Sequence, residues 1–458
     1  MQESNNQSTG GKLRREISLI ALIAMIIGLN IGGSLFALTA ISAGLTGPSL
    51  FIAQLISALP ILLAIVPYLT LTSAIPTTCA NYQYAKLFSY PLAVAAWMVL
   101  FIAIPVGMLP LFGIITGNFI LNLAPGLPID ITTIAIITML LFYLINVLGV
   151  KPAAYIQLVA VAILLIALFI FIFPGIPAIE THNLTPLFTG GAMGLIGASA
   201  LLFTLLAGGL FGIELGDEIK NARSTIPKAL IISMSIVIVI YLLIEIVAVG
   251  AIDWKVFAEE ESLVAPARVF LSSPLLNFFI IGGGILAAIT TINITYTAAG
   301  RYALAFARDR FFPGFFGNIS QRFGTPHWGL TLVVVLSVIT LLINPPLKVL
   351  GSMLNFGLLF MITLVLFGAY KLPEKHPAIY QNSKFKFSPK ILKITSLSAA
   401  SINIIFMIVL AIGMMTSEDS QWTFPLFVIA AVIGLILYYI KKRRTGIIPL
   451  NIKLDQME

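Results

Sequence analysis

The chain has 458 residues, of which 59% are hydrophobic and only 10% are charged. A soluble globular protein carries about 25% charged residues, so this composition excludes an ordinary cytosolic enzyme, a disordered regulator and a nucleic-acid-binding protein. The net charge of +8 suggests an acidic partner unless the positions of the basic residues explain it. The single cysteine, Cys79, allows no internal disulfide and is read as a small packed residue in an apolar region.

Long charge-free runs organise the sequence. A helix needs about 20 apolar residues to cross a hydrocarbon core about 30 Å thick. Residues 17–85 contain no Asp, Glu, Lys, Arg or His, and they begin a first membrane span that is too long for a cleavable signal peptide. The sequence therefore predicts an all-α integral membrane protein with 12 transmembrane helices, at 17–42, 48–72, 80–116, 131–149, 152–173, 192–218, 228–250, 274–306, 327–343, 347–370, 392–415 and 422–440.

The basic residues indicate the orientation of these spans, because Lys and Arg are retained in cytoplasmic loops. With the N-terminus inside, 23 of the 26 Lys and Arg residues fall in inner segments, and only Lys255, Arg268 and Lys348 fall outside. The positive charge thus follows from membrane orientation and requires no nucleic acid. We expect a multi-pass protein of the cell (plasma) membrane with both termini in the cytoplasm.

Two spans contain residues that interrupt a helix near its middle. The first span contains Gly28, Asn30, Gly32, Gly33 and Ser34, and the sixth contains the run 207–212, Ala-Gly-Gly-Leu-Phe-Gly. Each Gly costs about 1 kcal/mol relative to Ala in a helix. Paired interruptions in two halves of a chain are typical of transporters built from inverted repeats, although small residues also serve close helix packing.

Such hinges supply groups that bind a zwitterion. Unwinding frees N–H groups at Gly33, Ser34 and Leu35, which suit a carboxylate at the start of the next half-helix. The carbonyl groups around residues 28–30 and 205–207 suit an ammonium group or a cation. The two hinges together therefore predict a binding site for the ammonium and carboxylate groups that all amino acids share.

Several motifs resemble those of amino acid-polyamine-organocation transporters. The run 28–36, Gly-Leu-Asn-Ile-Gly-Gly-Ser-Leu-Phe, is similar to that family's first-helix motif, and the run 218–229, Glu-Ile-Lys-Asn-Ala-Arg-Ser-Thr-Ile-Pro-Lys-Ala, is similar to its signature after helix six. The run 299–309, followed by Pro313 and residues 323–326, resembles the family's helix eight and the loop after it. Pro76, Tyr82 and Tyr84 make a weaker match.

This resemblance implies a leucine-transporter-like fold with a 5+5 inverted repeat, broken helices 1 and 6, and two peripheral helices. The implied domains are a cytoplasmic tail (1–16), a first repeat (17–173), a second repeat (192–370), helices 11 and 12 (392–440) and a second cytoplasmic tail (441–458). It also implies secondary active transport of amino acids by alternating access, with no cofactor and no metal. The substrate-binding residues expected are Asn30, Ile31, Gly32, Gly33, Ser34, Phe203, Thr204, Leu205, Ala207, Gly208, Gly209 and Leu210.

The departures from the family pattern favour neutral, apolar amino acids. Where relatives often carry an aromatic residue and a Glu in helix six, this chain has Gly209 and Leu210, so a basic substrate would lack a carboxylate partner. The alternatives are an amino acid or amine exchanger or a polyamine carrier of the same fold, or a transporter-like nutrient sensor, which the short tails disfavour. An enzyme is not expected, because His182, His327 and His376 are scattered without metal-ligand spacing, and no repeated filter motif indicates a channel.

The coupling ion is left open between H+ and Na+, and exchange remains possible. Some relatives carry a lysine in helix five where this chain has Leu164, which leaves a cation site between the hinge-one carbonyls and the hydroxyls of Thr290 and Thr291, although a Thr hydroxyl often bonds to its own helix.

Glu214, close to Asp217, is a candidate for proton exchange, with a solvated vestibule residue as the alternative. Glu245 suits an interfacial structural role or a transport role, and Arg301, Arg308, Asp309 and Arg310 suggest an ion-pair cluster at the inner surface. The sequence does not indicate an oligomeric state.

Overall fold

A computed structural model describes residues 15–124, 126–416 and 421–446, and the regular secondary structure of these residues is helical. The first half of the chain forms α1 (Leu19–Asn30), α2 (Ser34–Thr46), η1 (Gly47–Ser49), α3 (Leu50–Ala74), α4 (Ala80–Phe88), α5 (Tyr90–Ala103), η2 (Ile104–Met108), α6 (Leu109–Leu123), α7 (Ile131–Leu148), α8 (Val150–Gly175), η3 (Ile176–Ala178) and η4 (Thr181–Leu184). The expected tails, 1–16 and 441–458, lie outside the described residues except for 15, 16 and 441–446.

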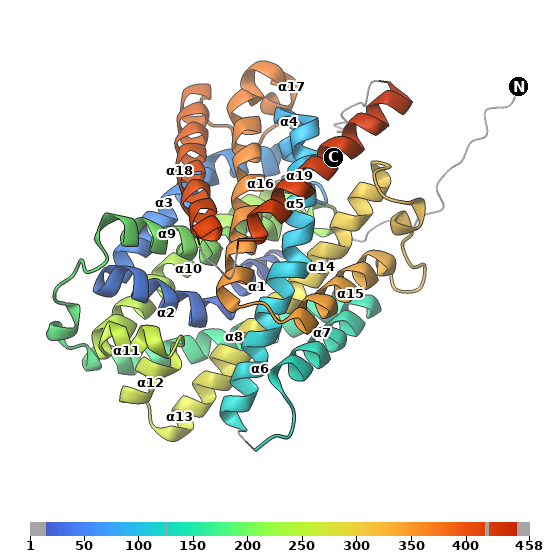
Figure 1. Ribbon diagram of the computed structural model, residues 1–458. Helices are drawn as coiled ribbons and strands as arrows, with labels where there is room; N and C mark the ends of the chain where they lie inside the picture. The colour runs from blue at the N-terminus through green and yellow to red at the C-terminus, as the bar shows by residue number, and fades with distance from the viewer. Residues whose placement is uncertain (1–14, 125, 417–420, 447–458) are drawn as a thin grey trace, which may run out of the picture.

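The second half is also helical. It forms α9 (Gly191–Ala207), η5 (Gly208–Glu214), η6 (Gly216–Glu218), α10 (Ala222–Ala251), α11 (Trp254–Glu259), α12 (Val264–Phe270), α13 (Ser273–Phe278), η7 (Phe279–Ile285), α14 (Leu286–Arg308), η8 (Gly314–Gly317), α15 (His327–Ile343), α16 (Leu347–Lys375), α17 (Pro377–Gln381), α18 (Pro389–Thr416) and α19 (Thr423–Thr445). The short helices α11, α12 and α13 gather at the end of the molecule opposite α4 and α17 (Figure 1).

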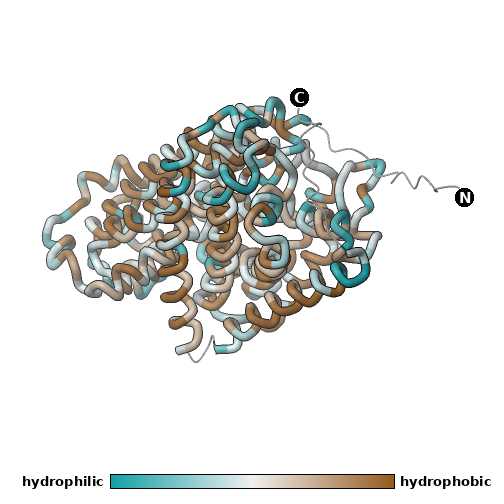
Figure 2. Tube along the Cα trace, turned by 90° about the horizontal axis from the view of Figure 1, so that it is seen from above, coloured by the Kyte–Doolittle hydropathy of each residue, from teal (hydrophilic) through white to brown (hydrophobic). Residues whose placement is uncertain are grey.

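The helices have the length and composition of a membrane protein. Ten segments of the described chain are long and apolar enough to cross a bilayer, and the first of them, Leu19–Ala74, is 56 residues long. A shorter apolar helix, His327–Ile343, adds to these. Many large apolar side chains are exposed on the outside of the bundle, and Figure 2 shows hydrophobic residues along the helices and hydrophilic ones gathered at turns. A helix satisfies its own backbone groups, which is what a lipid-facing segment requires.

Burial separates central helices from peripheral ones. In the most apolar stretch of Gly191–Glu214, 89% of the residues are buried within the protein, whereas the corresponding figures are 33% for α18 and 22% for α19. The interrupted segment α1–α2 packs against α8, α9, α10 and α14. The centre of the bundle therefore consists of the two interrupted segments and the helices that surround them.

The expectation of one continuous helix over 80–116 is wrong. The structure forms α4 and then breaks at Ser89, which is extended with φ −158° and ψ 113°. Pro91 explains the break, because it has no N–H to donate to the Leu87 carbonyl four residues earlier, whereas it suits the first turn of a new helix, α5. A second irregularity, the π-helical turn η2, contains Pro105.

Candidate functional site

The first interruption lies between α1 and α2. Ile31 closes α1 by donating to the Ile27 carbonyl, and Leu35 and Phe36 donate to the carbonyls of Gly32 and Gly33 at 3.1 Å each. Within the described chain, the N–H groups of Gly33 and Ser34, at the start of α2, have no hydrogen-bond partner. These two donors lie at the positive end of the α2 dipole, where the sequence predicts a carboxylate site. The third N–H group that the sequence suggests, that of Leu35, is bonded to the Gly32 carbonyl instead.

Glycine is required here because other helices approach the turn closely. A Cβ atom added at position 32 would lie 2.3 Å from the Thr291 hydroxyl oxygen, and one at position 33 would lie 3.0 Å from the side chains of Ala288 and Ile115. Larger residues would push α14 and α6 away from hinge one, the segment of residues 29–34 at the junction of α1 and α2. The glycines therefore bring three helices together around the free N–H groups.

The second interruption touches the first. The α-helix α9 ends at Ala207 and is followed directly by the 3-10 segment η5. We call residues 204–209, around this junction, hinge two. The Gly209 N–H donates to the side-chain oxygen of Asn30 at 2.7 Å. A Cβ atom at position 208 would lie only 2.6 Å from the Leu29 carbonyl oxygen. The backbones of the two hinges are thus in direct contact.

Tyr241 of α10 links the same two hinges. Its hydroxyl donates to the carbonyl of Asn30 at 2.5 Å and lies 3.2 Å from the carbonyl of Leu205. The side-chain amide of Asn30 also donates to the Ile26 carbonyl at 3.1 Å. The carbonyls of Asn30 and Leu205, which the sequence suggests as acceptors for a substrate ammonium group, are therefore already contacted by Tyr241 in this structure.

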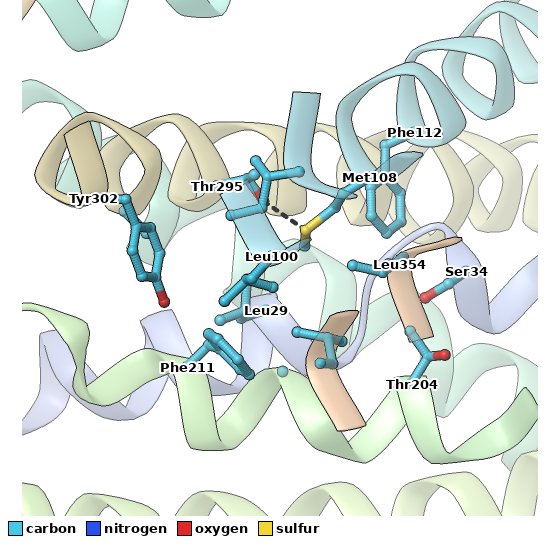
Figure 3. A pocket seen from close by; sticks show the side chains of 14 residues that line it. Leu29, Ser34, Leu100, Met108, Phe112, Thr204, Phe211, Thr295, Tyr302 and Leu354 are labelled. Carbon is cyan, nitrogen blue, oxygen red and sulfur yellow. Dashed lines mark hydrogen bonds between the residues drawn. The ribbon is translucent and has the colours of Figure 1, made fainter. Parts of the chain in front are cut away.

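A small cavity of about 40 Å³ lies beside the hinges, between five membrane spans (Figure 3). This volume holds roughly three water molecules. Its walls are mainly apolar, and no charged side chain of the described residues lines it. The lining residues are Leu29, Ser34, Leu100, Ile104, Met108, Phe112, Thr204, Gly208, Phe211, Thr295, Ala298, Tyr302, Leu354 and Leu358.

Only part of the expected substrate site borders this cavity. Ser34, Thr204 and Gly208 line it, whereas the other nine expected residues lie in the hinges or behind them. Phe203, for example, packs against Phe406 of α18 at a ring separation of 6.1 Å. The nine residues that do not line the cavity are Asn30, Ile31, Gly32, Gly33, Phe203, Leu205, Ala207, Gly209 and Leu210.

Most of the cavity wall could not be found from local sequence signals. Leu100, Ile104 and Met108 come from α5 and η2, and Leu354 and Leu358 come from α16. Their side chains are ordinary residues of apolar spans, so only packing shows which of them face the site. Pro105 was the available signal for the third span, because a proline within a span marks an irregular turn.

A set of oxygens gathers behind hinge one. The hydroxyls of Thr290 and Thr291 lie 3.5 and 3.2 Å from the Gly28 carbonyl oxygen, and both donate to the Ala287 carbonyl, at 2.9 and 3.0 Å. All of these groups are buried. Four oxygens from α1 and α14 therefore converge, which is the ligand type that a hard cation prefers.

Glu214 is buried rather than solvated, which overturns the vestibule interpretation. Its Oε1 accepts hydrogen bonds from the Asn81 side chain at 2.6 Å and from the Tyr302 hydroxyl at 2.7 Å. Its Oε2 has no partner among the described residues. Tyr302 also lines the cavity, so one side chain connects the cavity to this carboxyl group.

The predicted inner-surface cluster divides into two sites. Arg301 is buried and pairs with both oxygens of Glu218, at 3.0 and 3.2 Å, rather than with Asp309. Asp309 instead accepts hydrogen bonds from Lys86 and Tyr82. The Arg301–Glu218 pair is fixed beside the N-terminal segment, because Ile17 donates to the Glu218 carbonyl at 2.9 Å.

The contact between the hinges predicts a matched pair of substitutions. Gly208→Ala places a Cβ atom against the Leu29 backbone, and overpacking of this kind costs about 1–3 kcal/mol. The unfolding midpoint of the purified protein in detergent should fall. Gly197→Ala in the preceding helix α9 is the control, because its Cβ atom would meet only the Leu45 side chain at 3.9 Å. Equal midpoints for the two variants would show that the hinges are not in tight contact.

Comparisons with known proteins identify the family of this chain. A family model described as amino acid permease matches residues 17–437. The chain is 25% identical to the Branched-chain amino acid permease BcaP of Bacillus subtilis, with 94% of each protein covered, and 25% identical to the Methylthioribose transporter of the same organism, with 96% of each covered. It is 23% identical to the vacuolar Cationic amino acid transporter 8 of Arabidopsis thaliana, over 77% of this chain and 62% of that protein.

These relatives are membrane transporters, not enzymes. The match extends over almost all of the described helices, including both hinges and all the lining residues of the cavity. The chain is therefore a multi-pass membrane transporter and belongs to the amino acid permease family.

Proposed function

We propose that this protein is a secondary active transporter of neutral, apolar amino acids. The observation that carries the proposal is the uncharged cavity beside the free N–H groups of Gly33 and Ser34. The carboxylate of the substrate would accept hydrogen bonds from these two groups. Its side chain would then lie against Leu100, Ile104 and Leu354, whose apolar surface excludes water from an aliphatic group.

A polyamine or a basic amino acid is the weaker alternative. Its extra ammonium group would enter a cavity without a carboxylate on its wall, and desolvating an unpaired charge is costly. The nearest acid that the structure connects to the cavity, Glu214, lies behind the Tyr302 hydroxyl. Exchange between amino acids on the two sides remains the main alternative to ion-coupled uptake, and a nutrient sensor would bind without transporting.

We further propose the expected architecture of 12 transmembrane helices. Dividing Leu19–Ala74 at Gly47 and adding His327–Ile343 to the ten apolar segments gives this number. The first and second repeats would then cover residues 17–173 and 192–370, with helices 11 and 12 at 392–440. The interruptions at Gly32 and Gly208 fall in the first helix of each repeat, and the low burial of α18 and α19 suits helices outside the core.

The substrate proposal predicts a specific competition pattern. Proteoliposomes containing the purified protein should take up labelled leucine, and unlabelled phenylalanine or leucine should inhibit this uptake more strongly than arginine or putrescine. Preloaded and empty vesicles separate exchange from net uptake. Preferential inhibition by arginine or putrescine would contradict the proposal, because it requires a charged partner that the cavity wall lacks.

We propose a coupling cation beside hinge one, bound by Gly28, Ala287, Thr290 and Thr291. Their four oxygens suit Na+, and the Gly28 carbonyl lies in the last turn of α1. A proton on Glu214 is the second candidate, supported by its burial and by the bond from Tyr302.

Two variants distinguish these ions. Thr290→Val combined with Thr291→Val removes both hydroxyls and keeps the side-chain size, so we expect accumulation of leucine driven by a Na+ gradient to disappear. Glu214→Gln is the matched comparison and should retain this accumulation. Loss of accumulation driven by a pH gradient in Glu214→Gln alone would instead assign coupling to the proton.

We propose that both termini lie in the cytoplasm, as the distribution of Lys and Arg indicates. The test uses a Cys79→Ser background, because Cys79 is the one cysteine of the chain. In sealed cells, Lys255→Cys should react with a membrane-impermeant maleimide, whereas Lys442→Cys should react only after the membrane is opened. The reverse pattern would invert the proposed topology.

A further inference from the structure

Glu245 is a buried carboxyl group without a partner. It lies in the last two turns of α10, is completely buried, and neither of its oxygens has a hydrogen-bond partner among the described residues. An ionised carboxylate in such a place is very unfavourable, because neither water nor a donor compensates its charge. In this arrangement of the helices, the carboxyl group is therefore neutral and holds a proton.

The helices around α10 bring no countercharge to Glu245. Within their described residues, α1, α3 and α9 contain no charged side chain, and the one charged residue of α8 is in its first turn, whereas its other end, at Gly175, packs against Val247. The charged groups on the remaining described elements that pack against α10 are paired or exposed elsewhere. The paired ones are Arg268 with Glu260, His182 with Glu180, Glu214 with Asn81 and Tyr302, Glu218 with Arg301, and Asp217 with the Thr78 N–H, whereas Lys255 and Glu259 are at the surface. Tyr241 is the titratable side chain close to Glu245.

Tyr241 connects this carboxyl group to the hinges. It lies four residues before Glu245, on the same face of α10, and its hydroxyl donates to the carbonyls of Asn30 and Leu205. We call the contacts of the Tyr241 hydroxyl with these two carbonyls, together with the Asn30–Gly209 hydrogen bond, the hinge clasp. A carboxylate is a stronger acceptor than a carbonyl, so an ionised Glu245 would compete for the same hydroxyl proton.

We propose that Glu245 is a proton-binding site that controls the hinge clasp. While it holds its proton, Tyr241 stays on the hinge carbonyls. When the helices separate and water reaches Glu245, its carboxyl O–H bond breaks, the proton passes to water, and the carboxylate draws the Tyr241 hydroxyl away. Opening of the hinges is thereby coupled to release of one proton. The proton site itself is independent of the substrate, whereas its effect on transport rests on the proposed function.

The first experiment detects the proton directly. The infrared spectrum of the purified wild-type protein at neutral pH should contain a carboxylic-acid C=O band that is missing from Glu245→Gln and still present in Glu259→Gln, whose parent carboxyl group is exposed. Tyr241→Phe should keep the band, because it leaves the carboxyl group in place. A spectrum of Glu245→Gln identical to that of the wild type would overturn the proposal, whatever the substrate is.

The second experiment measures the consequence for transport. Leucine exchange by the wild type should slow as pH is lowered from 8 to 5, because a held proton favours the clasp. Glu245→Gln, which remains neutral, should exchange leucine at a rate that no longer varies with pH in this way, and Tyr241→Phe should likewise lose this dependence. Matching pH profiles for Glu245→Gln and the wild type would overturn the proposal. Absence of leucine exchange in every protein, with the infrared band intact, would contradict the substrate assignment and leave the proton site supported.

Discussion

The contact between two interrupted helices determines the rest of this structure. Hinge one and hinge two approach so closely that a single Cβ atom at Gly208 would collide with the backbone at Leu29. The Asn30 side chain and the Tyr241 hydroxyl form hydrogen bonds with backbone groups that this approach brings together. The N–H groups of Gly33 and Ser34 remain available, and they lie beside a cavity whose described lining is uncharged. The irregular backbone is tolerated within an apolar bundle because it is buried by other helices rather than exposed to lipid.

The sequence predicts the interruptions because their signal is local. Glycines in the middle of an apolar span are unfavourable in a helix, and both predicted breaks, near Gly32 and Gly208, are present. The continuous helix expected at 80–116 is wrong for a related reason, since hydropathy alone does not register the helical hydrogen bond that Pro91 cannot donate. Apolar composition identifies a span, whereas single residues determine where its helix starts and stops.

The candidate site was predictable only in part. Ser34, Thr204 and Gly208 belong to the hinges and were expected, but the walls from the third, eighth and tenth spans depend on which side of each helix faces the centre. Leu354 and Ala298 are indistinguishable in sequence from residues that face lipid. The roles of Asn30 and Tyr241 were also hidden, because both depend on a contact between α1, η5 and α10, segments far apart in the chain.

The most direct test of this account is an experimental structure of the purified protein with leucine bound. We predict that the leucine carboxylate lies within hydrogen-bond distance of the Gly33 and Ser34 N–H groups, about 2.7–3.2 Å, with the aliphatic group directed toward Leu100 and Leu354. Leucine bound outside the cavity, or with its carboxylate directed away from hinge one, would contradict the central claim that the broken helices form the substrate site.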